Sequence, residues 1–313
     1  MNLAFLFPGQ GSQSVGMMTA FESLPAVRPT FDEASAALGF DLWALVDGGP
    51  EEELGKTVNT QPIMLTAGVA LYRAWKDLGG PEPSVVAGHS LGEYTALVVA
   101  GVLEFAQTVS LVRFRAQAMQ EAVPEGTGAM AAILGLDEAA LSGVCEEASS
   151  AGVAEPANFN SPGQVVIAGE VAGVRRAMEL AKAHGAKRAV LLAMSAPSHC
   201  SLMRPAAERL QKLLDAASVR SPSIPVINNV DVATEQTPER IRDALIRQLS
   251  NPVRWSQIVT AMATRGVRLM VECGPGGVLA GLNKRIVPDV KTAALRDAEG
   301  LRELALQSRS ELP

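Results

Sequence analysis

Aromatic residues are scarce in this chain, at 4% of its 313 residues, so a core must be built mainly from aliphatic side chains. Cysteine is scarce too: Cys145, Cys200 and Cys273 have neither metal-ligand spacing nor the even number of a disulfide framework. This cysteine usage favours a reducing compartment, and we expect a cytoplasmic protein that holds no metal.

Long apolar runs are also missing, and none reaches the ~18 residues of a membrane-spanning helix. The apolar start, residues 1–7, lacks a basic segment and ends at Pro8. It therefore predicts a first strand rather than a targeting peptide. The formal net charge is -6, and no long basic run offsets it, which argues against nucleic acid as the main partner.

Short apolar runs alternate with helical patterns along most of the chain, which favours an α/β fold with a mainly parallel sheet. The expected strands are residues 3–7, 85–87, 225–230 and 268–273. The expected helices of this part are residues 63–78, 93–100, 103–123, 201–217 and 238–248, with a final helix after residue 277.

The pattern changes after residue 123. Strands are expected at 126–134, 164–169 and 190–194, and helices at 137–149 and 171–184. This succession is typical of a β-α-β-β-α-β, ferredoxin-like unit. We expect residues 124–196 to form an inserted subdomain, and residues 1–123 and 197–313 to form one larger α/β domain.

The pentapeptide Gly88-His89-Ser90-Leu91-Gly92 lies between an expected strand and an expected helix. A Gly-x-Ser-x-Gly turn in that context is a nucleophile elbow. The two glycines permit a sharp turn, and the first amides of the following helix can stabilise an oxyanion. The motif predicts that Ser90 is a nucleophile that carries an acyl group.

A serine nucleophile needs a base, and the chain has only three histidines. His89 adjoins the serine but points another way, so a structural hydrogen bond is the preferred interpretation. His184 lies at a polar helix end, where a cation suits the helix dipole. By elimination, His199 is the expected base, because it lies in a loop between a strand and a helix. No acidic residue stands out to orient its imidazole, so the orienting group stays open.

The loop Gly9-Gln10-Gly11 follows the first strand but does not continue as a dinucleotide-binding motif, because Ser14 stands where a third glycine is due. A backbone amide donated to an oxyanion fits this loop better.

Arg113 and Arg115 flank the apolar stripe of the expected helix 103–123 on opposite sides. The pattern does not choose between them. Whichever turns into the pocket would bind an anionic substrate, because a guanidinium holds a carboxylate through two hydrogen bonds.

Seven blocks in this order resemble the malonyl-CoA:acyl carrier protein transacylases, the discrete acyltransferases of bacterial type II fatty acid synthesis. The blocks are residues 7–13, the elbow extended through Tyr94, Arg115, residues 197–199, 228–230, 248–252 and 274–276. The resemblance extends from Leu3 to about Ile286. It implies an α/β-hydrolase-like large domain with a ferredoxin-like insertion.

The resemblance also implies ping-pong transfer of a malonyl group from malonyl-CoA to the phosphopantetheine thiol of acyl carrier protein, with no permanently bound cofactor. The implied roles are nucleophile for Ser90, base for His199, oxyanion-hole amides for Gln10 and Leu91, carboxylate binding for Arg115, and orientation of His199 by the backbone carbonyl of Gln248.

An acidic carrier protein needs a local basic patch on this chain. The candidates are Lys187, Arg188, Arg204, Lys284 and Arg285. We expect a monomer, because no long apolar stripe is left over. The alternatives are a discrete acyltransferase that supplies a polyketide synthase (PKS), a serine thioesterase or hydrolase, and a non-catalytic carrier-binding subunit.

Overall fold

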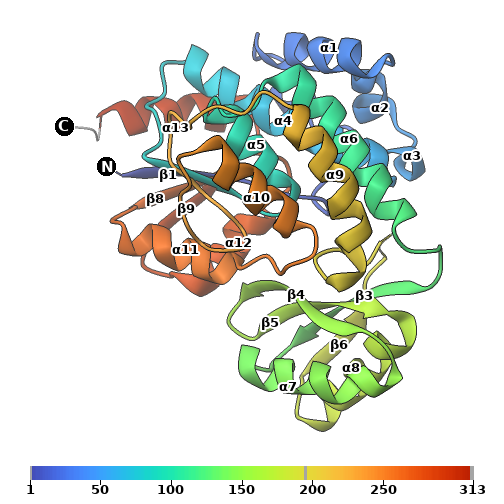
Figure 1. Ribbon diagram of the computed structural model, residues 1–313. Coiled ribbons are helices and arrows are strands. Elements are labelled where there is room, and N and C mark those ends of the chain that lie inside the picture. The colour runs from blue at the N-terminus through green and yellow to red at the C-terminus, as the bar shows by residue number, and fades with distance from the viewer. Residues whose placement is uncertain (1, 194–195, 311–313) are drawn as a thin grey trace.

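Two sheets organise the computed structural model, which describes residues 2–193 and 196–310 (Figure 1). The larger sheet has the order β7-β2-β1-β8-β9, and all of its pairs are parallel. Its strands are β1 (Leu3–Phe7), β2 (Val85–Gly88), β7 (Val226–Ile227), β8 (Leu269–Glu272) and β9 (Lys291–Ala294). The expected α/β fold with a mainly parallel sheet is therefore confirmed.

The helices of this larger part lie on both faces of the sheet. They are α1 (Val27–Leu38), α2 (Leu42–Gly48), α3 (Glu51–Gly55), α4 (Thr57–Asp77), α5 (Leu91–Val99), α6 (Phe105–Glu121), α9 (Arg204–Ala216), α10 (Pro238–Gln248), α11 (Trp255–Thr264), α12 (Val278–Ile286) and α13 (Ala298–Ser310).

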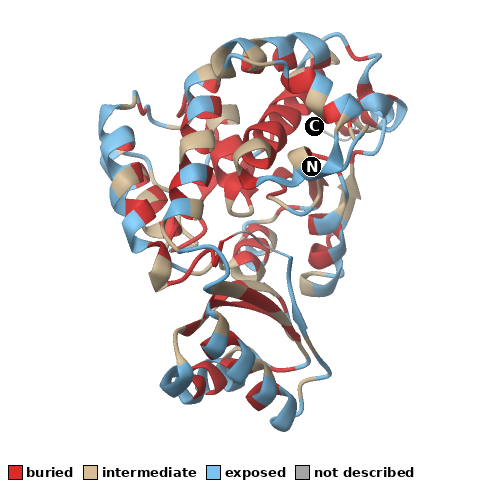
Figure 2. Ribbon diagram, turned by 90° about the vertical axis from the view of Figure 1, so that its right-hand side faces the viewer, coloured by how far each residue is buried: buried red, intermediate tan, exposed pale blue. Residues whose placement is uncertain are grey.

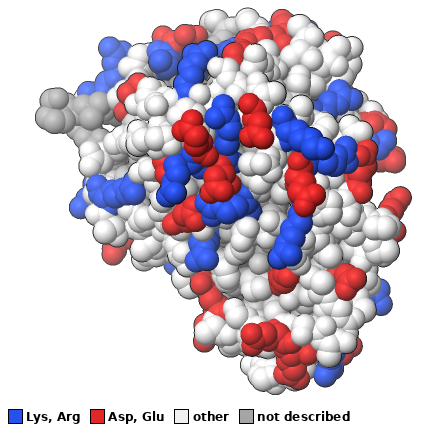
Figure 3. Space-filling model, viewed as in Figure 1, with Lys and Arg blue, Asp and Glu red and all other residues white. Residues whose placement is uncertain are grey.

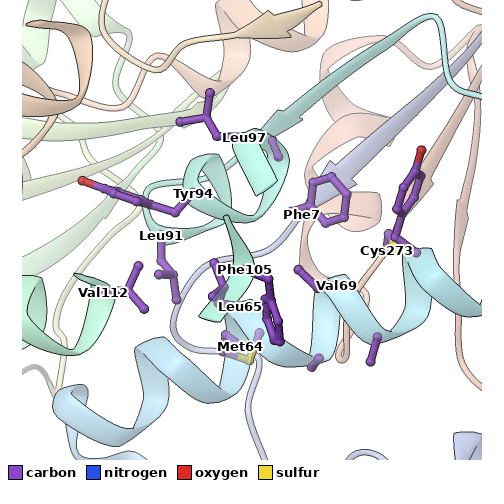
Figure 4. Close-up of a cluster of buried hydrophobic side chains, with 14 of the residues drawn as sticks. Phe7, Met64, Leu65, Val69, Leu91, Tyr94, Leu97, Phe105, Val112 and Cys273 are labelled. Atoms are coloured by element: carbon purple, nitrogen blue, oxygen red, sulfur yellow. The ribbon is translucent and has the colours of Figure 1, made fainter. Parts of the chain in front are cut away.

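Strand β1 shows why the sheet is covered on both sides. All five of its residues are buried, and alternate side chains point to opposite faces. Phe5 and Phe7 join a cluster with α4, α5 and α6, whereas Ala4 and Leu6 pack with α11. Figure 4 shows part of the first cluster around Phe7, and Figure 2 shows that buried residues gather between the outer helices.

The smaller sheet has the order β4-β5-β3-β6, and all of its pairs are antiparallel. Its elements follow the chain as β3 (Gly128–Leu134), α7 (Glu138–Ala148), β4 (Ala154–Ser161), β5 (Gln164–Glu170), α8 (Val171–Ala183) and β6 (Arg188–Leu191). This succession and strand order are those of the expected ferredoxin-like unit.

The last strand of this unit differs from its expected position. The sequence predicted a strand over 190–194, whereas β6 begins at Arg188, because Arg188 pairs with Leu134 of β3. Met194, at the end of the predicted range, lies outside the described residues. We propose 124–196 as the limits of this subdomain, since its first strand begins at Gly128 and its last ends at Leu191.

The two faces of the smaller sheet have different partners. One face packs Ile133 and Ile167 against α7 and α8, on the side away from the larger sheet (Figure 1). The other face places Met130 and Val166 beside Cys200, which belongs to the larger domain. Backbone hydrogen bonds also join Ala157 and Phe159 of β4 to Val253, at 2.9 Å each. The insertion is thus anchored over one end of the parallel strands.

Candidate active site

The elbow serine lies between the end of β2 and the first turn of α5. Ser90 has a positive φ of 52°, which a side-chain-bearing residue seldom adopts. A Cβ at Gly88 would collide with the Gly92 backbone, and a Cβ at Gly92 would collide with the Phe7 carbonyl. The turn is so tight that only glycine fits these two positions. This tight turn places Ser90 at the carboxyl edge of the sheet.

His199 and Ser90 are in hydrogen-bond contact, although 109 positions separate them. Nε2 of His199 lies 2.7 Å from Oγ of Ser90, and Nδ1 lies 2.8 Å from the backbone carbonyl oxygen of Gln248. Because the carbonyl can only accept, Nδ1 donates to it, and Nε2 is left to accept the serine proton. The orienting group that the residues alone left open is thus a main-chain oxygen.

Burial sets the protonation state of His199, whose side chain is almost fully enclosed. It lowers the pKa of the imidazole to about 3, and the positive charge of Arg115 contributes to the same shift. The imidazole is therefore neutral at ordinary pH and able to take a proton.

Arg115 also reaches the site. Its guanidinium is buried; Nη2 donates to Oε1 of Gln248 at 3.1 Å and lies 3.3 Å from Oγ of Ser90. Nη1 donates to Oε1 of Gln61 at 2.9 Å. Arg113, by contrast, stacks on the Phe40 ring, with its Cζ 4.8 Å from the ring centroid. The structure separates the two arginines that the helical pattern left equivalent.

Gln10 and Leu91 border the same small cavity as Ser90. The cavity has a volume of about 80 Å³, and its lining also includes Met119 and Met130. Within the described part of the chain, no backbone hydrogen bond is made by the amide of Gln10 or of Leu91. Both amides can therefore donate to a ligand, and the cavity has room for a short acyl group, well below the size of a typical cofactor site.

Two residues without a predicted role hold the elbow in place. Asn229 accepts a hydrogen bond from the Ser90 amide at 2.7 Å and donates to the Gly88 carbonyl at 2.7 Å. Glu93 accepts from the Asn229 amide at 2.9 Å and from the Gln248 side chain at 2.8 Å. Asn229 lies in a block that carried the resemblance, but no spacing rule joins it to Ser90, 139 positions away.

The remaining histidines lie apart from the proton path. His89 contacts Oδ1 of Asn160 through Nε2 at 2.8 Å, a structural hydrogen bond beside the site. His184 lies at the end of α8, exposed, with Nε2 3.7 Å from Oε2 of Glu147.

The five candidate docking residues are all exposed. Lys187 directly precedes β6, which begins at Arg188. Arg204 begins α9, and Lys284 and Arg285 lie in the last turn of α12. Arg285 donates to Oε1 of Gln164 at 2.9 Å, which connects α12 to the smaller sheet. Cationic and anionic groups are interspersed on the face seen in Figure 3.

No group of three or more potential metal-ligating side chains occurs in residues 2–193 and 196–310. In the same ranges, no helix has the length and apolar character needed to cross a membrane.

Comparison with known proteins connects this geometry to a family. A family model described as "Acyl transferase domain" matches residues 4–300. The malonyl CoA-acyl carrier protein transacylase of Escherichia coli K12 is 57% identical over 299 residues, which cover 95% of this chain and 97% of that protein.

Two solved structures resemble the structure of this chain over nearly its whole length. An acyl-carrier-protein S-malonyltransferase from Burkholderia pseudomallei 1710b has a TM-score of 0.96 and 56% identity, and the match covers 98% of this chain and 100% of that one. A malonyl-transacylase in complex with its type II PKS acyl-carrier protein has a TM-score of 0.97 and 53% identity, over 98% of this chain and 100% of that one.

Proposed function

This chain belongs to the acyl transferase family, and we propose that it transfers the malonyl group of malonyl-CoA to the phosphopantetheine thiol of acyl carrier protein, for fatty acid chain elongation. One observation carries the proposal: the Arg115 guanidinium lies beside a Ser90 hydroxyl that is also in contact with His199. A cation next to the nucleophile suits an acyl group with a free carboxylate, whereas a simple thioesterase has no need of it.

In the first half of the reaction, Ser90 attacks the thioester carbonyl while Nε2 of His199 takes the hydroxyl proton. The Gln248 carbonyl holds the imidazole in the productive tautomer and stabilises its positive charge. The developing oxyanion would accept hydrogen bonds from the amides of Gln10 and Leu91. His199 then protonates the CoA thiolate, and a malonyl ester remains on Ser90.

The second half runs the same steps with a new nucleophile. The carrier thiol loses its proton to His199 and attacks the ester, the amides again hold the oxyanion, and Ser90 recovers its proton. Throughout both halves, Arg115 pairs with the malonyl carboxylate, which places the reacting carbonyl beside Ser90. The small cavity holds only the acyl group, so CoA and the carrier arm must occupy the space outside it in turn.

The proposed chemistry uses only side chains, backbone amides and the substrate, so we expect no permanently bound cofactor. We also propose a monomer and a cytoplasmic location, the latter because all three cysteines are free and buried. The acidic carrier would dock on the exposed basic residues Lys187, Arg188, Arg204, Lys284 and Arg285.

Intact mass spectrometry tests the proposal directly. We expect one malonyl adduct after brief incubation with malonyl-CoA, and its transfer to the thiol of added holo acyl carrier protein. An adduct that decays equally fast without the carrier would indicate a hydrolase. No adduct with malonyl-CoA would contradict the proposal.

A PKS-associated transferase is the second candidate, because the relative solved with a type II PKS acyl-carrier protein is 53% identical to this chain. Its chemistry is the same and only the carrier differs. Transfer rates to the fatty acid carrier and to a PKS carrier of the same organism separate the two, and the carrier with the higher kcat/KM identifies the pathway.

A further inference from the structure

Glu93 is a buried carboxylate that the proposed acyl-transfer steps leave unused. It lies in the first turn of α5, three residues after the nucleophile, and its side chain is 2% exposed. Burying a carboxylate is costly unless hydrogen bonds compensate for the lost water. Its partners therefore indicate what it does.

The side-chain amide of Gln248 is one of these partners. Its nitrogen, Nε2, lies 2.8 Å from Oε2 of Glu93 and 3.0 Å from the backbone carbonyl oxygen of Ser90. Both oxygens are acceptors, so the amide nitrogen must face them. The amide oxygen then faces the opposite way and accepts from Nη2 of Arg115 at 3.1 Å.

The opposite orientation of this amide is excluded by its neighbours. A flipped Gln248 would place its oxygen against the Glu93 carboxylate and the Ser90 carbonyl, and its NH₂ group against the guanidinium of Arg115. Every one of these contacts is repulsive, and the side chains of Glu93, Gln248 and Arg115 are all buried. The Glu93 oxygen and the Arg115 guanidinium, on opposite sides of the amide, thus favour the same orientation.

We propose that Glu93 is a positioning residue for the acyl-binding site: by fixing the orientation of the Gln248 amide, it holds the Arg115 guanidinium in place for an acidic acyl group. The same carboxylate holds the amide of Asn229, whose side chain accepts from the Ser90 amide. Glu93 thus connects the elbow backbone to Arg115, which in the proposed function selects the acyl group.

The neutral amide between the two charges is central to this arrangement. A carboxylate in direct contact with Arg115 would occupy the guanidinium and repel a malonyl carboxylate. With Gln248 between them, Glu93 fixes the amide without touching Arg115 and leaves the guanidinium free to bind substrate.

The test compares Glu93→Gln with Glu93→Met. Glutamine keeps an oxygen that can accept from Gln248 and Asn229, whereas methionine has a similar length and no such acceptor. The readout is the acyl preference, defined as kcat/KM for acyl-enzyme formation from malonyl-CoA divided by that from acetyl-CoA. We expect Glu93→Met to lower this preference by about tenfold or more, and Glu93→Gln to keep it within about threefold of wild type.

Glu272 provides the matched control. It is a fully buried carboxylate that accepts from the Ala280 amide at 2.8 Å, at the start of α12, and so holds a different part of the chain. Glu272→Met should leave the acyl preference unchanged in the folded fraction. An equal loss of rate for both acyl groups in Glu93→Met would indicate a purely structural role and overturn the proposal.

If Glu93→Met does not fold, the double variant Glu93→Met/Gln248→Met decides, because it leaves neither a carboxylate nor an amide unpaired. The proposal requires its acyl preference to equal that of Gln248→Met alone, and a further loss would overturn it. The inference rests on the proposed function, and loading of the wild type with malonyl-CoA distinguishes failure of that function from failure of the role of Glu93. Failure of the wild type to load malonyl-CoA refutes the function, whereas normal wild-type loading with an unaltered preference in Glu93→Met refutes only the role of Glu93.

Discussion

Nη2 of Arg115 lies 3.3 Å from Oγ of Ser90, so the cation that would bind the substrate touches the nucleophile itself. The same guanidinium nitrogen also holds the Gln248 side chain. When a malonyl carboxylate arrives, it would replace Ser90 as the partner of Arg115, and the hydroxyl would be left to His199. In the proposed reaction, substrate binding and activation of the nucleophile would therefore be coupled through the side chain of Arg115.

Replacement of Arg115 by alanine should raise the transition-state free energy of malonyl transfer by about 2–4 kcal/mol and lower kcat/KM accordingly. This is the usual cost of losing one partner of a buried charge pair. Steady-state kinetics with malonyl-CoA and acetyl-CoA measure it. We expect the acetyl rate to change far less, because acetyl has no carboxylate. Arg113→Ala is the control on the same helix, and unchanged malonyl kinetics in Arg115→Ala would refute the assignment.

Loss of the Ser90 hydroxyl should abolish the acyl-enzyme. Ser90→Ala is expected to show no mass increase after incubation with malonyl-CoA, because Ser90 supplies the hydroxyl that contacts Nε2 of His199. Ser110→Ala, an exposed serine on α6, should load normally. A malonyl adduct that persists in Ser90→Ala would place the nucleophile elsewhere.

The pH dependence of loading should reflect the neutral state of His199. Burial lowers its pKa to about 3, so the acid limb of kcat/KM should lie below pH 5 rather than near 6.5. Since the charge of Arg115 contributes to the shift, Arg115→Gln should move that limb to higher pH. An acid limb that stays at pH 6–7 in the wild type would show that the imidazole is not held neutral.

Local patterns singled out Ser90 and His199, whose side chains lie 2.7 Å apart in the structure, because an elbow has a fixed spacing and only three histidines exist. They did not find Asn229 or Glu93, since a side chain that holds a backbone amide has no distinctive residue type or spacing. Strand β4 was not located because its sequence, with Pro156 and Asn158, lacks an apolar run, and its position depends on pairing with β5 and Val253.

The start of α4 shows a different reason for error. The sequence predicted a helix from residue 63, directly after Pro62, and a proline disfavours a helical conformation of the residue before it. The helix begins instead at Thr57 and continues through Pro62. Thr57, Thr60 and Gln61 are all buried in this first part, so tertiary packing outweighs the local preference.

Charge reversal at the docking candidates should weaken recognition of the carrier without altering the chemistry. We expect Lys284→Glu/Arg285→Glu to raise KM for acyl carrier protein several-fold, with loading from malonyl-CoA unchanged, because these side chains are exposed and outside the cavity. The same applies to Lys187→Glu/Arg188→Glu and to Arg204→Glu. Arg28→Glu, on α1, is the control, and a KM equal to wild type would remove the tested pair from the docking surface.

Glu93 should also make stability depend on pH in a direction that is unusual for a carboxylate. Burial raises its pKa from 4.5 to about 7, which outweighs the hydrogen bonds from Gln248 and Asn229 that favour the ionised form. The folded state therefore binds more protons than the unfolded state between these two values. The resulting stabilisation is present below pH 4.5 and is lost as the pH rises through about 7.

Glutamine cannot titrate, so Glu93→Gln lacks this loss. Relative to wild type, its free energy of unfolding should rise by about 2 kcal/mol between pH 5.5 and pH 8.5, as measured by urea denaturation at several pH values. Glu121→Gln is the control: its hydrogen bonds from Gln117 and Arg209 lower the pKa of Glu121, so this carboxylate stays ionised throughout the range. A constant difference between Glu93→Gln and wild type across this range would mean that Glu93 is ionised at all of these pH values, and that its hydrogen bonds, rather than its burial, determine its charge.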